Sequence, residues 1–92
     1  MALSGQKTVT TAGTAVALGT QQIAAALLVK ALTTNTGLVY VGNDGAGDVT
    51  SANGYPLSAG DQVIFDHVAN LANVMLNSAV NGEGVAWLAL NI

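Results

Sequence analysis

Turn-forming residues recur every eight to twelve positions along this chain, and this spacing constrains the fold more than any other feature. Asparagine and glycine tolerate positive backbone φ angles, so pairs such as Asn-Gly favour tight turns. Between the turns lie short runs rich in Val, Thr, Tyr, Phe and Ile, which suit a pleated sheet. This arrangement is typical of an all-β sandwich or barrel. The turn signals are Ala12-Gly13, Asn35-Thr36-Gly37, Gly42-Asn43-Asp44-Gly45, Asn53-Gly54, Ala59-Gly60-Asp61 and Asn81-Gly82.

The runs between these turns predict about eight short strands, the number found in a two-sheet antiparallel sandwich with a jelly-roll-like arrangement. A length of 92 residues suits one small domain, so we expect residues 1–92 to form a single β-sandwich domain. A short helix within Gln21–Leu32 is an alternative, because that segment contains good helix formers. The expected strands are Gln6–Thr11, Thr14–Leu18, Leu27–Thr33, Leu38–Gly42, Tyr55–Leu57, Gln62–His67, Asn73–Ala79 and Val85–Asn91.

Two of the expected strands are apolar on both faces. In Val85–Asn91, alternate side chains on either face are hydrophobic, and Leu38–Val41 repeats the pattern. A two-layer sandwich covers only one face of each sheet from within. We therefore expect a partner surface on the second face, with another copy of the chain as the simplest candidate. By contrast, Asn73–Asn77 alternates polar and apolar residues and predicts a half-exposed strand with Met75 toward solvent.

Composition excludes several kinds of partner. Hydrophobic residues make up 51% of the chain and charged residues only 8%, which argues against intrinsic disorder. Lys7 and Lys30 are the two basic residues, too few for a phosphate-binding patch, so we expect no nucleic-acid partner. The longest unbroken apolar run, Ile23–Val29, is far shorter than a membrane span, so we expect no membrane partner and take the N-terminus as part of the fold. The absence of cysteine excludes disulfides and thiolate sites.

The sequence offers little for catalysis. His67 is the single histidine, and its neighbour Asp66 would point to the opposite face of a strand. None of the serines that could complete a triad lies in a nucleophile-elbow sequence. We therefore expect a protein that is not an enzyme. The serines considered are Ser4, Ser51, Ser58 and Ser78.

The glycine-rich stretch Gly42–Asp48 suggests either a plain loop or an ion site. It lacks the Gly-Lys-Ser/Thr ending of a phosphate-binding loop. Asp44 and Asp48 could offer two oxygen ligands to calcium, but the spacing of an EF-hand is absent. We expect a β-turn or loop, with no metal and no cofactor, and keep calcium as an alternative.

Aromatic and leucine side chains supply the candidate partner-binding residues. Tyr40 and Trp87 lie within apolar strands and are expected in the core or an interface. Tyr55 follows the Asn53-Gly54 turn and is the aromatic residue expected to be exposed, so a carbohydrate-binding function would depend on it. Leu88 and Leu90 occupy the second face of the last expected strand. Tyr40, Tyr55, Trp87, Leu88 and Leu90 are therefore the candidate contact residues.

Four segments carry a resemblance to a known family: Thr11–Val16, Thr34–Gly42, Asn53–Asp61 and Val80–Leu88. Over Val9–Leu90 the chain resembles the small capsid cement or decoration proteins of tailed phages, which have jelly-roll-like sandwiches. The resemblance implies a non-enzymatic virion protein on the capsid exterior, a homo-oligomer, expected as a trimer, that binds the major capsid protein and bridges capsomers. Strand-and-turn signatures of this kind also occur in head-fibre and tail-adaptor proteins. These roles, and a host-surface carbohydrate-binding adhesion module, are alternatives.

Overall fold

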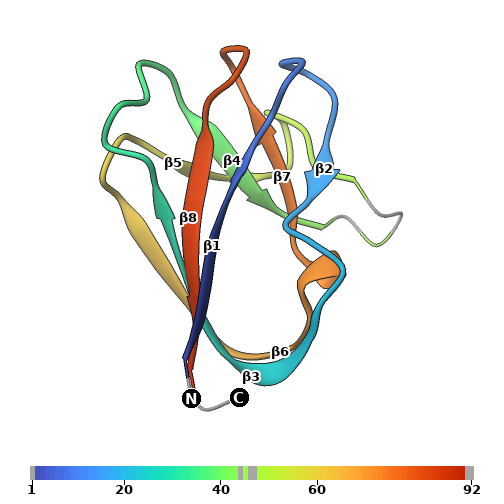
Figure 1. The fold of residues 1–92 in the computed structure, drawn as a ribbon. Helices are drawn as coiled ribbons and strands as arrows, with labels where there is room; N and C mark the ends of the chain where they lie inside the picture. Colours follow the sequence, from blue (N-terminus) through green and yellow to red (C-terminus); the bar gives the residue numbers. More distant parts are fainter. Residues whose placement is uncertain (1, 44, 46–47, 91–92) are drawn as a thin grey trace.

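The computed structural model of the chain describes residues 2–43, 45 and 48–90, and this part contains eight strands and one short 3-10 helix. The chain crosses between two layers after every strand except the fourth, and the helical turn lies between the sixth and seventh strands (Figure 1). The elements are β1 (Leu3–Thr8), β2 (Val16–Ala17), β3 (Gln22–Ala31), β4 (Val39–Gly42), β5 (Tyr55–Leu57), β6 (Gln62–Asn70), η1 (Leu71–Asn73), β7 (Met75–Ser78) and β8 (Gly84–Ala89). Within the described residues, no helix is long and apolar enough to span a membrane.

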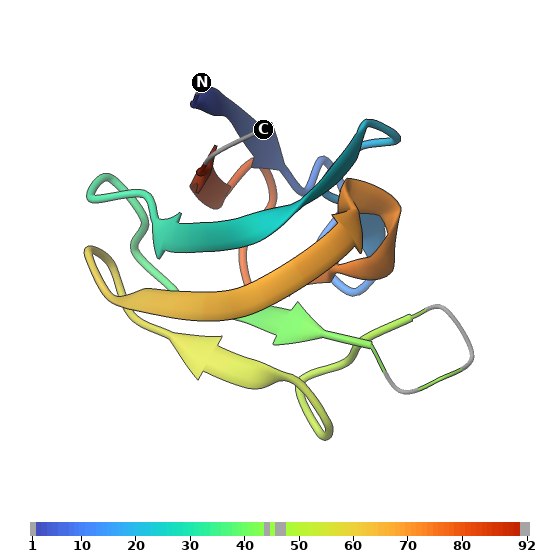
Figure 2. The same cartoon turned by 90° about the horizontal axis from the view of Figure 1, so that it is seen from below.

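The strands form two four-stranded antiparallel sheets. Sheet A has the order β1-β8-β3-β6 and sheet B has the order β2-β7-β4-β5. The pairs β1 with β8, β2 with β7, β3 with β6 and β4 with β5 correspond to one long hairpin rolled into two layers, which is a jelly-roll arrangement. Seen from below, the long ribbons of β3 and β6 run beside each other, with β4 and β5 in the other layer (Figure 2). The predicted jelly-roll-like sandwich of eight strands is confirmed.

The core lies between the sheets and is built from alternate residues of both. In β3 every second residue from Ile23 to Ala31 is buried, which is the period of a strand with one face inward. Sheet B supplies fully buried side chains at Val39, Leu57 and Leu76. Leu3, Val16, Val63, Phe65 and Trp87 are partly buried and pack against this core.

The helical alternative for Gln21–Leu32 is wrong, because β3 begins at Gln22 and pairs with both β6 and β8. Two flanking strands satisfy its backbone groups and bury its alternate side chains, which overrides the helix propensity of its alanines. The strand is strained at Ala24, whose φ of 46° lies in the left-handed region that residues with a Cβ rarely adopt. This residue lies beside a shift in the β3–β6 register. Such β-bulges bend the strands that contain them.

Most of the other predicted strand bounds are wrong by a few residues, and two of these differences have a local reason. The first strand was expected over Gln6–Thr11 but spans Leu3–Thr8, and after it Val9 is buried, with its N–H donating to the Glu83 carbonyl (2.8 Å). The seventh strand begins at Met75, because Asn70 and Asn73 form a capping box around η1 and remove Asn73 from the sheet.

The predicted exposed face of β7 is also wrong. Met75 is half-buried and Asn77 is only 3% exposed. Both side chains point away from the core side, where Leu76 lies, but loops cover this outer face at Asn77.

Candidate contact surface and polar cavity

The outer face of sheet A carries a row of large apolar side chains across three neighbouring strands. Leu28 of β3 pairs with Leu88 of β8 on one side and with Ile64 of β6 on the other. Ile64 is 59% exposed, and the two leucines are half-buried. Ala86 of β8 lies on the same face, and so does Leu90, the residue after β8, because its N–H donates to the Ala26 carbonyl (2.9 Å) and so continues the alternation with the buried Val85 and Ala89. We call Leu28, Ile64, Ala86, Leu88 and Leu90 the outer apolar patch.

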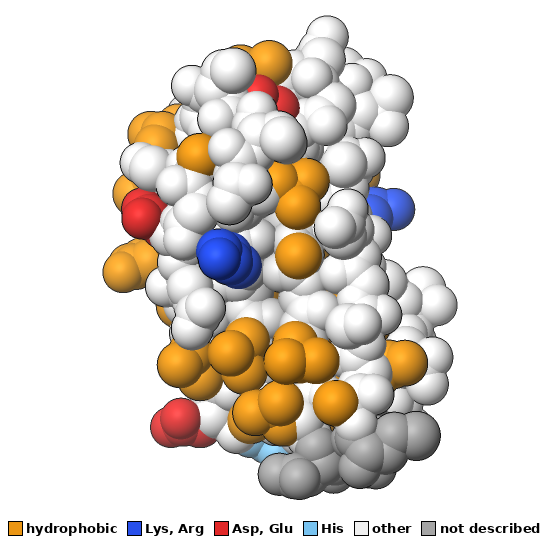
Figure 3. All heavy atoms as spheres, turned by 60° about the vertical axis from the view of Figure 1, so that its left-hand side comes forward, with side chains coloured by type: hydrophobic (Ala, Val, Ile, Leu, Met, Phe, Trp, Pro, Cys, Tyr) orange, Lys and Arg blue, Asp and Glu red, His pale blue; other side chains and the backbone are white. Residues whose placement is uncertain are grey.

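The outer apolar patch has a polar border at one end. Lys30 pairs with Ala86 and with Gln62, so this end of the patch carries one positive charge and one amide. A shallow depression of about 220 Å³ lies between this end and the leucines. Figure 3 shows hydrophobic side chains clustered low on this side of the molecule, over the strands of sheet A, with a lysine above them. Nothing within the described part of the chain covers this cluster.

The structure separates the three candidate residues in and just after β8. Leu88 and Leu90 belong to the outer apolar patch, where the sequence placed them. Trp87 alternates with them and packs against the core, although it also borders the shallow depression. Its indole lies over β1 at Gly5, where an added Cβ would stand 2.7 Å from Trp87 Cζ2. Trp87 therefore closes the sandwich beside the edge strand, and Gly5 leaves room for its ring.

The other two candidates, Tyr40 and Tyr55, belong to sheet B. Tyr55 is 61% exposed, as the sequence predicted for the residue after the Asn53-Gly54 turn. Tyr40 is half-buried and points outward, between the buried core residues Val39 and Val41. Because the structure places Tyr40 beside a cavity and leaves Tyr55 out of its lining, the two tyrosines do not act together there.

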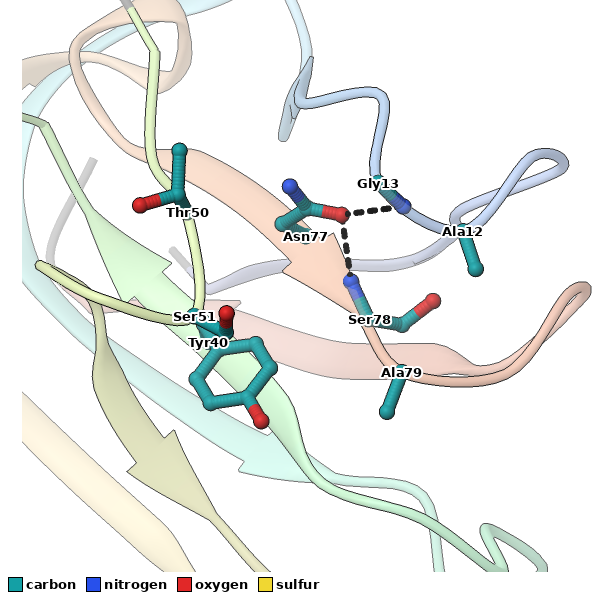
Figure 4. Close-up of a pocket in the computed structure, with 8 residues that line it drawn as sticks. All are labelled: Ala12, Gly13, Tyr40, Thr50, Ser51, Asn77, Ser78 and Ala79. Atoms are coloured by element: carbon teal, nitrogen blue, oxygen red, sulfur yellow. Dashed lines mark hydrogen bonds between the residues drawn. The ribbon is translucent and has the colours of Figure 1, made fainter.

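The cavity beside Tyr40 has a volume of about 440 Å³ and opens on the outer face of sheet B. Its walls come from the strands β4 and β7 and from the loops that follow β1 and β4 (Figure 4). We call it the polar cavity. Its lining residues are Ala12, Gly13, Tyr40, Thr50, Ser51, Asn77, Ser78 and Ala79.

Asn77 holds the walls of the polar cavity together. Its Oδ1 accepts hydrogen bonds from the backbone N–H of Gly13 (3.0 Å) and of Ser78 (2.8 Å), and its Nδ2 donates to the carbonyl of Val49 (2.9 Å). Figure 4 shows Asn77 between the loop that carries Gly13 and the loop that follows Val49. One buried amide therefore fixes two loops, far apart in sequence, against β7.

Glu83 performs a similar structural task at the β7–β8 turn. Its carboxylate accepts hydrogen bonds from the backbone N–H of Thr36 (2.6 Å) and of Gly37 (2.9 Å), and from the Thr36 hydroxyl (2.9 Å). The backbone hydrogen bond from Thr36, followed by the one from Gly37, lowers the pKa of Glu83 below its ordinary value of 4.5. This carboxylate anchors the loop that carries Thr36 and Gly37.

The residues considered for catalysis do not converge. His67 is exposed and borders a separate cavity of about 370 Å³ with Phe65 and Val68. Ser51 and Ser78 line the polar cavity, whose lining includes no histidine or carboxylate. Among the described residues, no group of three or more His, Asp or Glu side chains could hold a metal ion. Asp44, one of the two calcium candidates, lies outside the described residues, and Asp48 is exposed.

Leu28, Ile64 and Asn77 were not among the residues that the sequence singled out. For Ile64 a signal was present, because the alternation of Gln62–His67 places it opposite Val63 and Phe65. Comparisons of the chain with protein-family models, with curated proteins and with solved structures find no match.

Proposed function

We propose that this chain is a non-enzymatic structural virion protein, a capsid cement or decoration protein that binds the capsid exterior and stabilises the junctions between capsomers. The observation that carries the proposal is the outer apolar patch. Three large apolar side chains form a row that no described residue covers, and such a surface is the kind that a partner buries. The virion setting follows from the resemblance carried by Val9–Leu90.

The patch joins copies of the chain in this proposal, and the oligomer, a trimer, then binds the major capsid protein. Apolar contacts suit a permanent assembly, because their strength varies little with salt concentration, whereas exposed ion pairs are screened. Several copies attached to one particle also add weak individual contacts together through avidity. A chain with only 8% charged residues is consistent with this mode of association.

The energy available at one side chain can be estimated from its exposure. Complete burial of an isoleucine contributes about 1.5–3 kcal/mol, and Ile64 is 59% exposed, so covering it contributes roughly 1–2 kcal/mol per copy. Ile64→Ala should therefore weaken each contact by about five- to thirtyfold. Ile64→Asp should weaken it further, because the interface would then contain an unpaired carboxylate.

The test compares Ile64→Asp with a control variant, Val80→Asp, by native mass over a hundredfold dilution. Val80 is also an exposed apolar residue, at 39%, but lies in the β7–β8 turn outside the patch. We expect an oligomer for the wild type and for Val80→Asp, and a folded monomer for Ile64→Asp. A wild type that is monomeric at every concentration would contradict the proposed oligomer.

Capsid attachment is tested separately, by cosedimentation with particles of the cognate major capsid protein. The wild type should bind to saturation, and Ile64→Asp should bind weakly because it has lost avidity. If an oligomeric wild type does not cosediment, the capsid role is wrong although the interface is right.

A further inference from the structure

The polar cavity has the dimensions of a small-molecule site and lies on the layer opposite the outer apolar patch. Its volume of about 440 Å³ falls within the range of roughly 300–1,000 Å³ for ligand pockets. Tyr40 and Asn77 pair across β4 and β7 with side chains on the outer face of sheet B, whereas the patch lies on sheet A. The role proposed for the patch leaves this cavity without a function.

The lining selects a ligand without charge. None of the eight lining residues is Asp, Glu, Lys, Arg or His. An ion that entered would lose hydration without gaining a counter-charge, which is costly. Polar side chains nevertheless line the cavity, at Thr50, Ser51 and Asn77, whereas the Ser78 hydroxyl donates to the carbonyl of Val80 (2.8 Å). These groups suit a neutral ligand that is itself rich in hydrogen-bonding groups.

The aromatic ring of Tyr40 further restricts the kind of ligand that the cavity would bind. Tyr40 presents an apolar ring with a hydroxyl tip, and Ala12 and Ala79 add methyl groups to the lining. A sugar ring has the matching properties, since its C–H faces are apolar and its rim carries hydroxyl groups. We propose that the polar cavity binds a neutral saccharide, with one face of a sugar ring against Tyr40 and its hydroxyl groups toward Ser51 and Asn77.

The cavity is already held in shape, which lowers the entropic cost of binding. Asn77 is 3% exposed and is fixed by three hydrogen bonds, in which one of its two amide N–H groups donates to a described residue, Val49. The facing loop is fixed as well, because the Thr50 N–H donates to Asn53 Oδ1 (2.7 Å). Gly54 lets this loop approach β4, since an added Cβ there would lie 2.6 Å from Tyr40 Cβ.

The carbohydrate site therefore differs from the one that the sequence suggested. Tyr55 is the more exposed tyrosine, but it does not line the polar cavity. An exposed aromatic residue alone does not orient a sugar, whereas Tyr40 has polar groups on the neighbouring strand and loop.

The test is a ¹H–¹⁵N NMR titration of the ¹⁵N-labelled full chain with glucose, galactose, mannose and N-acetylglucosamine, each into the millimolar range. We expect at least one of them to shift the backbone amides of Gly13, Ser51 and Ser78 to saturation. Ser51→Ala should weaken binding roughly two- to tenfold, as expected for one hydrogen bond. Tyr40→Ala should weaken it by about tenfold or more.

Tyr55→Ala is the matched aromatic control and should bind as the wild type does. Because Tyr40→Ala removes a half-buried side chain and could unfold the sheet, Ser51→Ala, at an exposed loop position, keeps the test valid on its own. No saturable shift with any of the four sugars would overturn the proposal, as would equal affinity of the wild type and Ser51→Ala. Tighter binding of glucuronate than of glucose would overturn the inference that the ligand is neutral.

Discussion

Replacing Asn77 tests whether one buried amide holds the loops after β1 and β4 against the outer face of sheet B. The side chain makes three hydrogen bonds, to the N–H groups of Gly13 and Ser78 and to the carbonyl of Val49. In Asn77→Ala all three partners lose their hydrogen bonds. The bonds to Ser78 and Val49 are buried, so water does not readily replace the amide there.

The expected loss of stability is about 3 kcal/mol. Each buried polar group left without a partner costs about 1–3 kcal/mol, and Asn77→Ala leaves two of them. For a domain of this size, a loss of about 3 kcal/mol lowers Tm by roughly 12–24 °C. Urea denaturation followed by tryptophan fluorescence measures the loss directly, since Trp87 packs against the core. A loss below about 1 kcal/mol would refute the reasoning.

Two further variants test the donor group of Asn77 and the effect of burial on the cost of a lost hydrogen bond. Asn77→Asp keeps an oxygen for the two N–H groups but places a carboxylate against the Val49 carbonyl, so it should be destabilised at neutral pH. Protonation restores a donor, and its stability relative to the wild type should therefore rise on acidification. Asn53→Ala removes a single exposed hydrogen bond from Thr50 and should cost only about 0.5–1 kcal/mol.

Two further predictions concern the β7–β8 turn and the pairing of β1 with β8. The folded state holds the pKa of Glu83 below 4.5, so the ionised side chain stabilises the fold fully above that pH. This contribution to the free energy of unfolding is lost as the pH falls through the folded-state pKa, which gives the stability an acid limb. Glu83→Gln should flatten this acid limb in denaturation curves recorded from pH 7 to pH 3. An acid limb as steep in Glu83→Gln as in the wild type would show that another group causes it. Gly84→Ala should cost about 3 kcal/mol or more in the same measurement, because its Cβ would overlap the carbonyl oxygen of Lys7 on the paired strand.

The sequence predicted the elements of the fold better than their boundaries. The turn signals and alternation are local, so Tyr55–Leu57 was predicted with the bounds that the structure has. The start of β3 was missed because Ala24, Ala25 and Ala26 have strong helix propensity, which only the neighbouring strands override. The order of the strands was not predictable, since the pairing of β1 with β8 joins the two ends of the described chain.

The candidate sites also divide into features that a local segment specifies and features that depend on the order of the strands. Leu88 and Leu90 were identified because their strand is apolar on both faces, a property visible in one segment. Leu28 joins them only because β8 lies between β1 and β3, and no local pattern specifies that order. The polar cavity was missed for a similar reason, since it forms where loops fold over the pair of Tyr40 and Asn77.

The two proposals depend on the same property of this jelly roll: loops cover part of the outer face of one sheet but not the apolar patch on the outer face of the other. Within the described residues sheet A leaves the outer apolar patch uncovered, whereas loops fixed by Asn77 shield part of sheet B and leave a polar cavity. Association through the outer apolar patch therefore leaves the polar cavities accessible on the other layer. An oligomer presents several of them, and many oligomers on one particle present more. A saccharide bound at millimolar affinity by one cavity would then be held about 10²–10⁴-fold more tightly by the assembly wherever the spacing of the sugars matches that of the cavities. Weak binding by the isolated chain is thus what this architecture predicts, and Ile64→Asp should abolish the gain in avidity while leaving the single site intact.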